Sequence, residues 1–310
     1  MIPSYTYRFV SEIHNDQNSS YIDSVAFHPD GHMFAASYGL NNQVRIYDSS
    51  TQCLLRTYQN PEARFDWPQG VTITNRHIIV SNKHRPIRKP GTFNVYRVDD
   101  PSEEPLTVFT TPVKHLREAH SFAVHNGRLL VTYCGKGIGA IVSYCFDDEE
   151  GKISGPTSIL DSQLVVQGDI KGLCFNEEGT KVIVTFSDSN GMAIFDVDED
   201  GVLSKAPVQT LQGSQFSRPE NLSTAKGLCA IANTTNNTVN LYNYNGDHFP
   251  DSPVQVIRDH LSFPHDACLS PDKKILVVSN FGLNVVNGEP QWRSFLHPRN
   301  DKLTFYELQE

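Results

Sequence analysis

Long apolar runs and a secretion signal are both missing from this sequence. No apolar stretch approaches the ~20 residues that a membrane-spanning helix needs, and residues Met1 to Arg8 contain no apolar signal core. The six cysteines include no Cys-x-x-Cys pair and form no small-domain disulfide framework. We therefore expect a cytoplasmic protein in a reducing compartment, with no membrane partner.

Positive charge and the common catalytic motifs are also scarce. Lys and Arg number 26 against 35 Asp and Glu, which gives a formal net charge of −9 and argues against a nucleic-acid partner, because phosphate binding needs a basic surface. The sequence contains no Gly-x-Ser-x-Gly elbow, no P-loop and no Gly-x-Gly-x-x-Gly after a strand. These absences exclude the commonest nucleotide-binding and serine-hydrolase designs.

Helical periodicity is nearly absent, and a repeated strand pattern takes its place. One frame, a polar residue followed by a strand, a tight turn and a second strand, occurs six times. The polar residue at the start of each frame is here called the mouth residue; the six mouth residues are Asp23, Gln69, His120, Lys171, Glu220 and His265. Successive mouth residues are 46, 51, 51, 49 and 45 residues apart, a period typical of four-stranded propeller blades.

The sequence therefore predicts an all-β fold, a six-bladed β-propeller with four-stranded blades, as a single domain over residues 1–310. The predicted blades cover approximately residues 20–60, 66–111, 118–162, 168–213, 217–259 and 262–310. The sixth blade lacks an outer strand, and the alternating segment Tyr5–Ile13 has no blade of its own. We expect this segment to close blade 6, which removes exposed sheet edges; the alternative is an exposed β tail.

The inner strand of each predicted blade carries a second regularity. Two places after the mouth residue stands a mostly bulky side chain, and three places after it a small one; the small set is Ala26, Thr72, Ala123, Cys174, Ser223 and Cys268. Because successive strand residues point to opposite faces, each inner strand is expected to show a bulky face to one neighbouring blade and a small face to the other.

The mouth residues begin their strands on one face of the disc, where they should ring the central axis. Glu220, His265 and Asp23 come from adjacent blades and His120 faces them, so carboxylates and imidazoles meet in a set that suits a divalent ion. The alternative is a wet mouth whose polar residues solvate one another. Lys171 favours that alternative, because an ammonium repels a cation, although it can instead pair with Glu220.

Two long connections overhang the same mouth and carry positive charge. The connection in blade 2 contains Lys83, Arg85 and Arg88, and the one in blade 6 contains Trp292 and Arg293. Arginine forks suit carboxylate or phosphate, so these residues, with Gln69 and Lys171, are candidates to bind an anionic ligand. Ordinary solvated loops remain the alternative.

Two stretches, Val25–Ser37 and Phe263–Asn280, resemble the inner strands of NHL-repeat, YVTN-repeat and gluconolactonase (senescence-marker-like) propellers. The gluconolactonase resemblance implies a divalent ion held by Glu, Asn and Asp residues at the starts of inner strands, with a carboxylate as base. Residue by residue, it implies Glu220, His265 and Asp23 as ligands and Glu220 or Asp23 as the catalytic base. The chain reads Pro219-Glu-Asn221 and Pro264-His-Asp266 where that group usually has Pro-Asn-Gly or Asn-Asp-Gly.

Two functional hypotheses follow. The first is a recognition scaffold that binds a small, possibly anionic, ligand or a protein or peptide at the mouth. The second is a lactonase- or esterase-type hydrolase that depends on one divalent metal ion, Ca²⁺, Zn²⁺ or Mn²⁺; under the first hypothesis no cofactor is needed.

Overall fold

The computed structural model describes residues 6–15, 21–84, 90–113, 116–134, 139–161, 169–246, 248–283, 285–286, 289–290 and 301–309. The elements assigned within these ranges are strands. No helix in the described ranges is long and apolar enough to cross a membrane.

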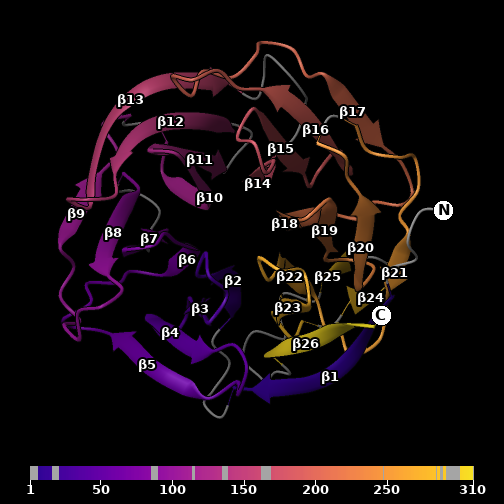
Figure 1. Cartoon of the computed structure of the whole chain (residues 1–310), viewed down its shortest axis with the longest axis horizontal. Coiled ribbons are helices and arrows are strands. Elements are labelled where there is room, and N and C mark those ends of the chain that lie inside the picture. The colour runs from indigo at the N-terminus through magenta and orange to yellow at the C-terminus, as the bar shows by residue number, and fades with distance from the viewer. Residues whose placement is uncertain are drawn as a thin grey trace.

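Six four-stranded antiparallel sheets stand around a common axis, which confirms the predicted six-bladed propeller (Figure 1). From the axis outward, blade 1 contains β2 (Ile22–Phe27), β3 (Met33–Tyr38), β4 (Gln43–Asp48) and β5 (Leu54–Gln59). Blade 2 contains β6 (Pro68–Ile73), β7 (His77–Asn82), β8 (Thr92–Arg97) and β9 (Thr107–Thr110). Blade 3 contains β10 (Glu118–His125), β11 (Arg128–Cys134), β12 (Ala140–Asp147) and β13 (Lys152–Asp161).

The second half of the ring has the same design. Blade 4 contains β14 (Ile170–Phe175), β15 (Lys181–Phe186), β16 (Gly191–Asp196) and β17 (Gln209–Gln212); blade 5 contains β18 (Pro219–Ala225), β19 (Leu228–Asn233), β20 (Thr238–Asn243) and β21 (Gln255–Ile257); and blade 6 contains β22 (Pro264–Leu269), β23 (Ile275–Asn280), β26 (Lys302–Gln309) and β1 (Thr6–His14). A short hairpin, β24 (Val285–Val286) and β25 (Glu289–Pro290), lies between β23 and β26.

The N-terminal strand closes the last blade, as predicted. β1 pairs antiparallel with β26 as the outer strand of blade 6 (Figure 1). Glu12 forms an ion pair with buried Lys302 at 2.5 Å, and His260 Nδ1 lies 3.0 Å from the same carboxylate. Tyr7 is buried, and its backbone N–H and C=O both bond the side chain of Gln255 in blade 5. β1 therefore also ties blade 6 to blade 5.

The apolar core is divided among the six spaces between neighbouring blades, one buried cluster in each space. The two faces of the inner strands behave as predicted. In blade 1, Val25 packs into the cluster shared with blade 6 and Ala26 against the cluster shared with blade 2. In blade 4, Leu173 packs toward blade 3 and Cys174 toward blade 5.

Each inner strand has a β-bulge at its mouth residue, a feature that the sequence analysis missed. In blade 1 the pairing steps from Ile22↔Tyr38 to Val25↔Ala36, so Asp23 and Ser24 together face one residue, Ser37. The same register shift occurs in the other five inner strands. A bulge re-aims side chains locally, and the inner strand of blade 6 begins at Pro264, before its mouth residue His265.

Hydroxyl groups on the second strands fasten these bulges to one another. Thr185 accepts a hydrogen bond from the N–H of Gly172 in its own blade and donates one to the carbonyl of Glu220 in the next. Thr132 makes the equivalent pair of bonds to Ser121 and Lys171. Ser37 and Ser279 also donate to the mouth-residue carbonyl of the following blade. These hydroxyl groups thus hold the backbone of four mouth residues in place around the axis, Asp23, Gln69, Lys171 and Glu220.

We expect Thr185→Val to lower the free energy of unfolding by about 2–4 kcal/mol, because a buried N–H and a buried C=O would each lose a partner at a cost of ~1–3 kcal/mol. Urea titration followed by tryptophan fluorescence measures this. Thr210→Val, at an exposed position in β17 of the same blade, is the matched control and should change stability by less than about 0.5 kcal/mol. Equal effects of the two substitutions would contradict the proposed role of the hydroxyl.

Candidate functional site

The six mouth residues meet in one cavity of about 160 Å³ at the axis. Its lining consists of Asp23, Gln69, His120, Lys171, Glu220 and His265 together with Lys83, Arg218, Tyr21, Trp67, Phe263 and Phe281. Lys83 was predicted to lie here. Of the other candidate ligand-binding residues, Arg85, Arg88, Trp292 and Arg293 lie outside the described residues.

Four of the six residues that stand two places before a mouth residue have a left-handed backbone conformation. Tyr21, Trp67, Arg218 and Phe263 have positive φ angles between 48° and 59°, a region that non-glycine residues enter at a cost and that is common at functional sites. Asparagine side chains hold three of them: Asn42, Asn190 and Asn237 accept the N–H of Trp67, Arg218 and Phe263, respectively. The sequence signal that could have revealed this is the recurrent large side chain two residues before a mouth residue.

Three of the mouth residues form a group with the geometry of a metal site. His120 Nε2 lies 3.5 Å and His265 Nε2 lies 3.7 Å from Glu220 Oε2. One ligand atom from each residue lies within 4.8 Å of the other two, and all three side chains are buried. Glu220 Oε2 has no hydrogen-bond partner among the described residues, which is a costly state for a buried carboxylate oxygen.

The second ring nitrogen sets the orientation of the His265 imidazole. His265 Nδ1 lies 2.8 Å from the carbonyl oxygen of Asp23, so Nδ1 carries the proton and donates, and Nε2 keeps its lone pair toward Glu220. The ring of Phe281 stacks on His265 at 4.1 Å and 10°. These two contacts fix the orientation of His265, whereas Nδ1 of His120 has no hydrogen-bond partner among the described residues.

Burial decides the protonation of the group. It lowers the pKa of His265 to about 3 and that of His120 well below its usual value, with the charge of Lys171 adding to both shifts. Burial also raises the pKa of Glu220, against the lowering effect of Lys171 and Arg218. Both imidazoles are therefore neutral at neutral pH, the form in which histidine binds metal ions.

The remaining charged mouth residues have other neighbours. Asp23 lines the same cavity and is buried, but it is not one of the three clustered residues. Lys171 pairs with Asp169 at 3.2 Å; burial lowers its pKa, but Cys134, Glu220 and Asp169 outweigh burial and raise it overall. Lys83 pairs with Glu118 at 2.9 Å. Lys171 therefore remains an ammonium beside the histidine and glutamate group.

Asp266, which follows His265, lies beneath the mouth. Its Oδ2 accepts bonds from Ser24 Oγ and from the N–H of Val25, both at 2.9 Å, yet burial raises its pKa to about 7 from an ordinary 3.8. Between these two values the folded protein holds a proton that the unfolded chain releases, so this residue makes stability fall as pH rises from about 4 to 7.

We expect Asp266→Asn to remove that pH dependence, because an amide oxygen can still accept both bonds and does not ionise. Relative to the variant, the wild type should lose about 4 kcal/mol of unfolding free energy between pH 4 and pH 8, at 1.36 kcal/mol per pKa unit. Urea midpoints measured across this range test the expectation. Glu199→Gln, in an exposed turn, is the control and should have the same pH dependence as the wild type. If the unfolding free energies of the wild type and Asp266→Asn changed in parallel with pH, the expectation would be refuted.

A six-bladed propeller with a buried, partly charged axial site is the class of protein that these features define. The family model described as "WD domain, G-beta repeat" matches residues 8–48, a span that runs from the closing strand β1 to the end of β4. No curated protein matches the chain by sequence.

Solved structures share the fold over nearly the whole chain. A luciferin-regenerating enzyme has a TM-score of 0.70 at 11% identity, over 99% of this chain and 95% of its own. A calcium-binding protein, regucalcin, from Agrobacterium tumefaciens has a TM-score of 0.64 at 10% identity, over 97% and 95%. A putative gluconolactonase has a TM-score of 0.63 at 12% identity, over 98% and 92%. The predicted likeness to the gluconolactonase kind of propeller is therefore confirmed at the level of the fold.

Proposed function

We propose that the axial mouth binds a divalent transition-metal ion through His120 Nε2, Glu220 Oε2 and His265 Nε2, and binds a small anionic ligand beside it. The convergence of two neutral imidazoles on a buried carboxylate oxygen without a hydrogen-bond partner supports this proposal. Two nitrogen ligands and one oxygen ligand suit Zn²⁺ or Mn²⁺, whereas Ca²⁺ prefers oxygen ligands throughout.

The charge and shape of the cavity support a small anion with a flat apolar part. Lys83, Lys171 and Arg218 line it, against the carboxylates of Asp23 and Glu220. Trp67 and Phe281, both partly exposed, supply aromatic surface. A cavity of about 160 Å³ is close to the ~150 Å³ that holds benzene in an engineered protein, so a ring-sized carboxylate fits best.

Titration calorimetry of the chelator-treated protein tests the metal site. We expect one equivalent of Zn²⁺ or Mn²⁺ to bind at least tenfold more tightly than Ca²⁺, and benzoate to bind more tightly to the metal-loaded protein than to the metal-free protein. Elemental analysis of the purified protein gives an independent reading. No stoichiometric binding of either transition metal would refute the proposal.

Hydrolysis of a lactone or ester is the second candidate function, and the position of Asp23 favours it. This carboxylate lies in the cavity outside the three proposed ligands, where it can accept a proton from water. A bound metal ion would polarise a carbonyl and lower the pKa of water. Asp23 would take the role of base, which the resemblance had also offered to Glu220.

Turnover of small lactones and aryl esters by the Zn²⁺- or Mn²⁺-loaded protein tests this second function. Asp23→Asn should lower kcat by at least 100-fold while the metal stays bound, since general-base catalysis contributes ~10²–10⁴-fold. Loss of turnover together with loss of the metal would assign Asp23 to the metal site instead. A protein or peptide partner at the same face and a cytoplasmic location stay predictions.

A further inference from the structure

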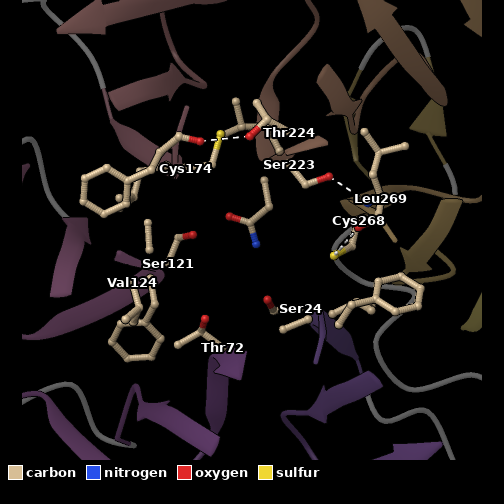
Figure 2. Close-up of a pocket in the computed structure, with 18 of the residues that line it drawn as sticks. Ser24, Thr72, Ser121, Val124, Cys174, Ser223, Thr224, Cys268 and Leu269 are labelled. Carbon is tan, nitrogen blue, oxygen red and sulfur yellow. Dashed lines mark hydrogen bonds between the residues drawn. The ribbon is translucent and has the colours of Figure 1, made fainter. Parts of the chain in front are cut away.

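A second cavity lies on the axis on the side opposite the mouth. Its volume is about 350 Å³, within the ~300–1,000 Å³ typical of ligand pockets. Each blade contributes a small polar side chain to it: Ser24, Thr72, Ser121, Cys174, Ser223 and Cys268 are arranged in a ring around the space (Figure 2). We call this space the lower cavity.

The β-bulges explain why two cavities share the axis. At His120, Glu220 and His265 the mouth residue lines the upper cavity, and the residue that follows each of them lines the lower one. Asn221 and Asp266 are therefore at the inner end of the lower cavity, directly behind the proposed metal ligands. The small residues three places after the mouth residues, such as Ala26, keep the rest of the space open.

The lower cavity has the opposite charge preference from the mouth. Asp266 and Glu177 line it, and no lysine or arginine does so among the described residues. His125 also lines it, and burial and the nearby Arg128 lower its pKa, so it is neutral at neutral pH. A positively charged molecule therefore meets two carboxyl groups and no lysine or arginine inside this space.

The surrounding face extends this negative field. The outer connections over residues 98–106, 148–151 and 197–208 lie on the same side of the disc as the lower cavity, and they contain ten Asp or Glu residues and one lysine. The inner turns on this side, between the first and second strands of the blades, are balanced in charge, with Asp30, Glu177, Glu178 and Asp272 against Arg76, Lys226, Lys273 and Lys274. Charge of one sign around a concave opening raises the local concentration of counter-ions. Cations are thus drawn toward the face into which this cavity opens.

The walls indicate an organic cation in preference to a bare metal ion. Phe122, Leu173 and Leu222 line the cavity beside the hydroxyl and thiol groups, and they offer apolar surface that a hydrated ion cannot use. Asn221 is 3% exposed, and its side-chain oxygen has no hydrogen-bond partner among the described residues. It stands beside Asp266 as a further acceptor for an N–H donor.

We propose that the lower cavity binds a small organic amine in its protonated form, with the ammonium group at Asp266 and Asn221 and the carbon chain against Phe122, Leu173 and Leu222. Oδ2 of Asp266 already bonds Ser24 and Val25, and these contacts hold the carboxylate in place for the ligand. This site is independent of the proposed function of the mouth.

Titration calorimetry with n-butylamine, n-butanol and butyrate separates charge from shape, because the three probes share a four-carbon chain. At about pH 7.5 the amine is protonated, as a lysine side chain is. We expect n-butylamine to bind at least tenfold more tightly than n-butanol. The amine should lose at least tenfold in affinity in Asp266→Asn, while any heat from butyrate stays the same in that variant.

Two further variants keep the test decisive. Ala26→Leu fills the cavity and leaves every charge in place, so it should also weaken amine binding at least tenfold, even if Asp266→Asn fails to fold. Glu199→Gln removes one acidic residue of the same face without touching the cavity, and it should change the affinity by less than about twofold. Absence of amine binding up to 10 mM, or equal binding by wild type and Ala26→Leu, would overturn the proposal.

Discussion

Replacing Glu220 by glutamine is expected to weaken Zn²⁺ or Mn²⁺ binding by at least 100-fold. Glu220 is the member of the cluster that both imidazoles face, at 3.5 and 3.7 Å, and its carboxylate would supply the negative charge of the ligand set. An amide of the same shape offers a neutral oxygen and leaves two neutral nitrogens as the other donors. Even loss of a residue that only orients a ligand costs ~10–100-fold, so loss of the charged ligand itself should cost more.

The stability of the variant distinguishes this effect from misfolding. Because burial penalises the ionised form of Glu220, the metal-free Glu220→Gln protein should be at least as stable as the metal-free wild type. Glu118→Gln is the matched control: Glu118 belongs to blade 3 and pairs with Lys83 near the cavity, but it is not one of the clustered residues. Calorimetry should show near-wild-type metal affinity for that control, and equal affinity in Glu220→Gln would contradict the assignment.

Removing residues 2–14 is expected to abolish cooperative folding. The deletion takes away the whole of β1, leaves β26 as an open edge, and removes Tyr7 from the core shared by blades 5 and 6. It also leaves Lys302, which is 5% exposed, without its partner Glu12; an uncompensated buried charge alone costs ~3–5 kcal/mol. That sum approaches the total stability of an ordinary domain, ~5–15 kcal/mol.

Size-exclusion chromatography and thermal unfolding measure the outcome, which should be aggregation or the absence of a sharp transition. A deletion of residues 2–5, which stops before the strand, is the control and should keep the transition. The single substitution Glu12→Ala should fall between them, with a loss of about 3–5 kcal/mol. A cooperative, monomeric protein without residues 2–14 would show that the ring holds without its closing strand.

The sequence predicted the blades well because their signals are local. Alternating apolar residues and turns such as Pro29-Asp30-Gly31 mark the individual blades. Blade 6 lacked a fourth strand in the sequence, and the alternating segment Tyr5–Ile13 was the one predicted strand left to supply it. The same logic placed the six mouth residues around one cavity. The sequence could not predict which mouth residues would contact one another, because the distance between His120 and Glu220 depends on how blades 3 and 5 face each other across the axis.

Other features had no signature in the alternation itself. A β-bulge adds one residue to a strand, and only the register against the partner strand reveals it, as at Ile22 and Val25. The left-handed Trp67 and its anchor Asn42 are 25 residues apart and in different blades. The lower cavity depends on the bulges, so it could not be expected before they were seen.

The pairing of β1 with β26 also bears on how the chain is made. On the ribosome, β1 emerges before the other strands of the ring, whereas its partner β26 follows roughly 300 residues later, or about 15–60 s at 5–20 residues per second. During that interval the edges of β1 are unpaired, whereas blades 1 to 5 can already form. Ring closure therefore waits for the synthesis of β26, and a chaperone that protects the unpaired β1 would act before the ring is complete.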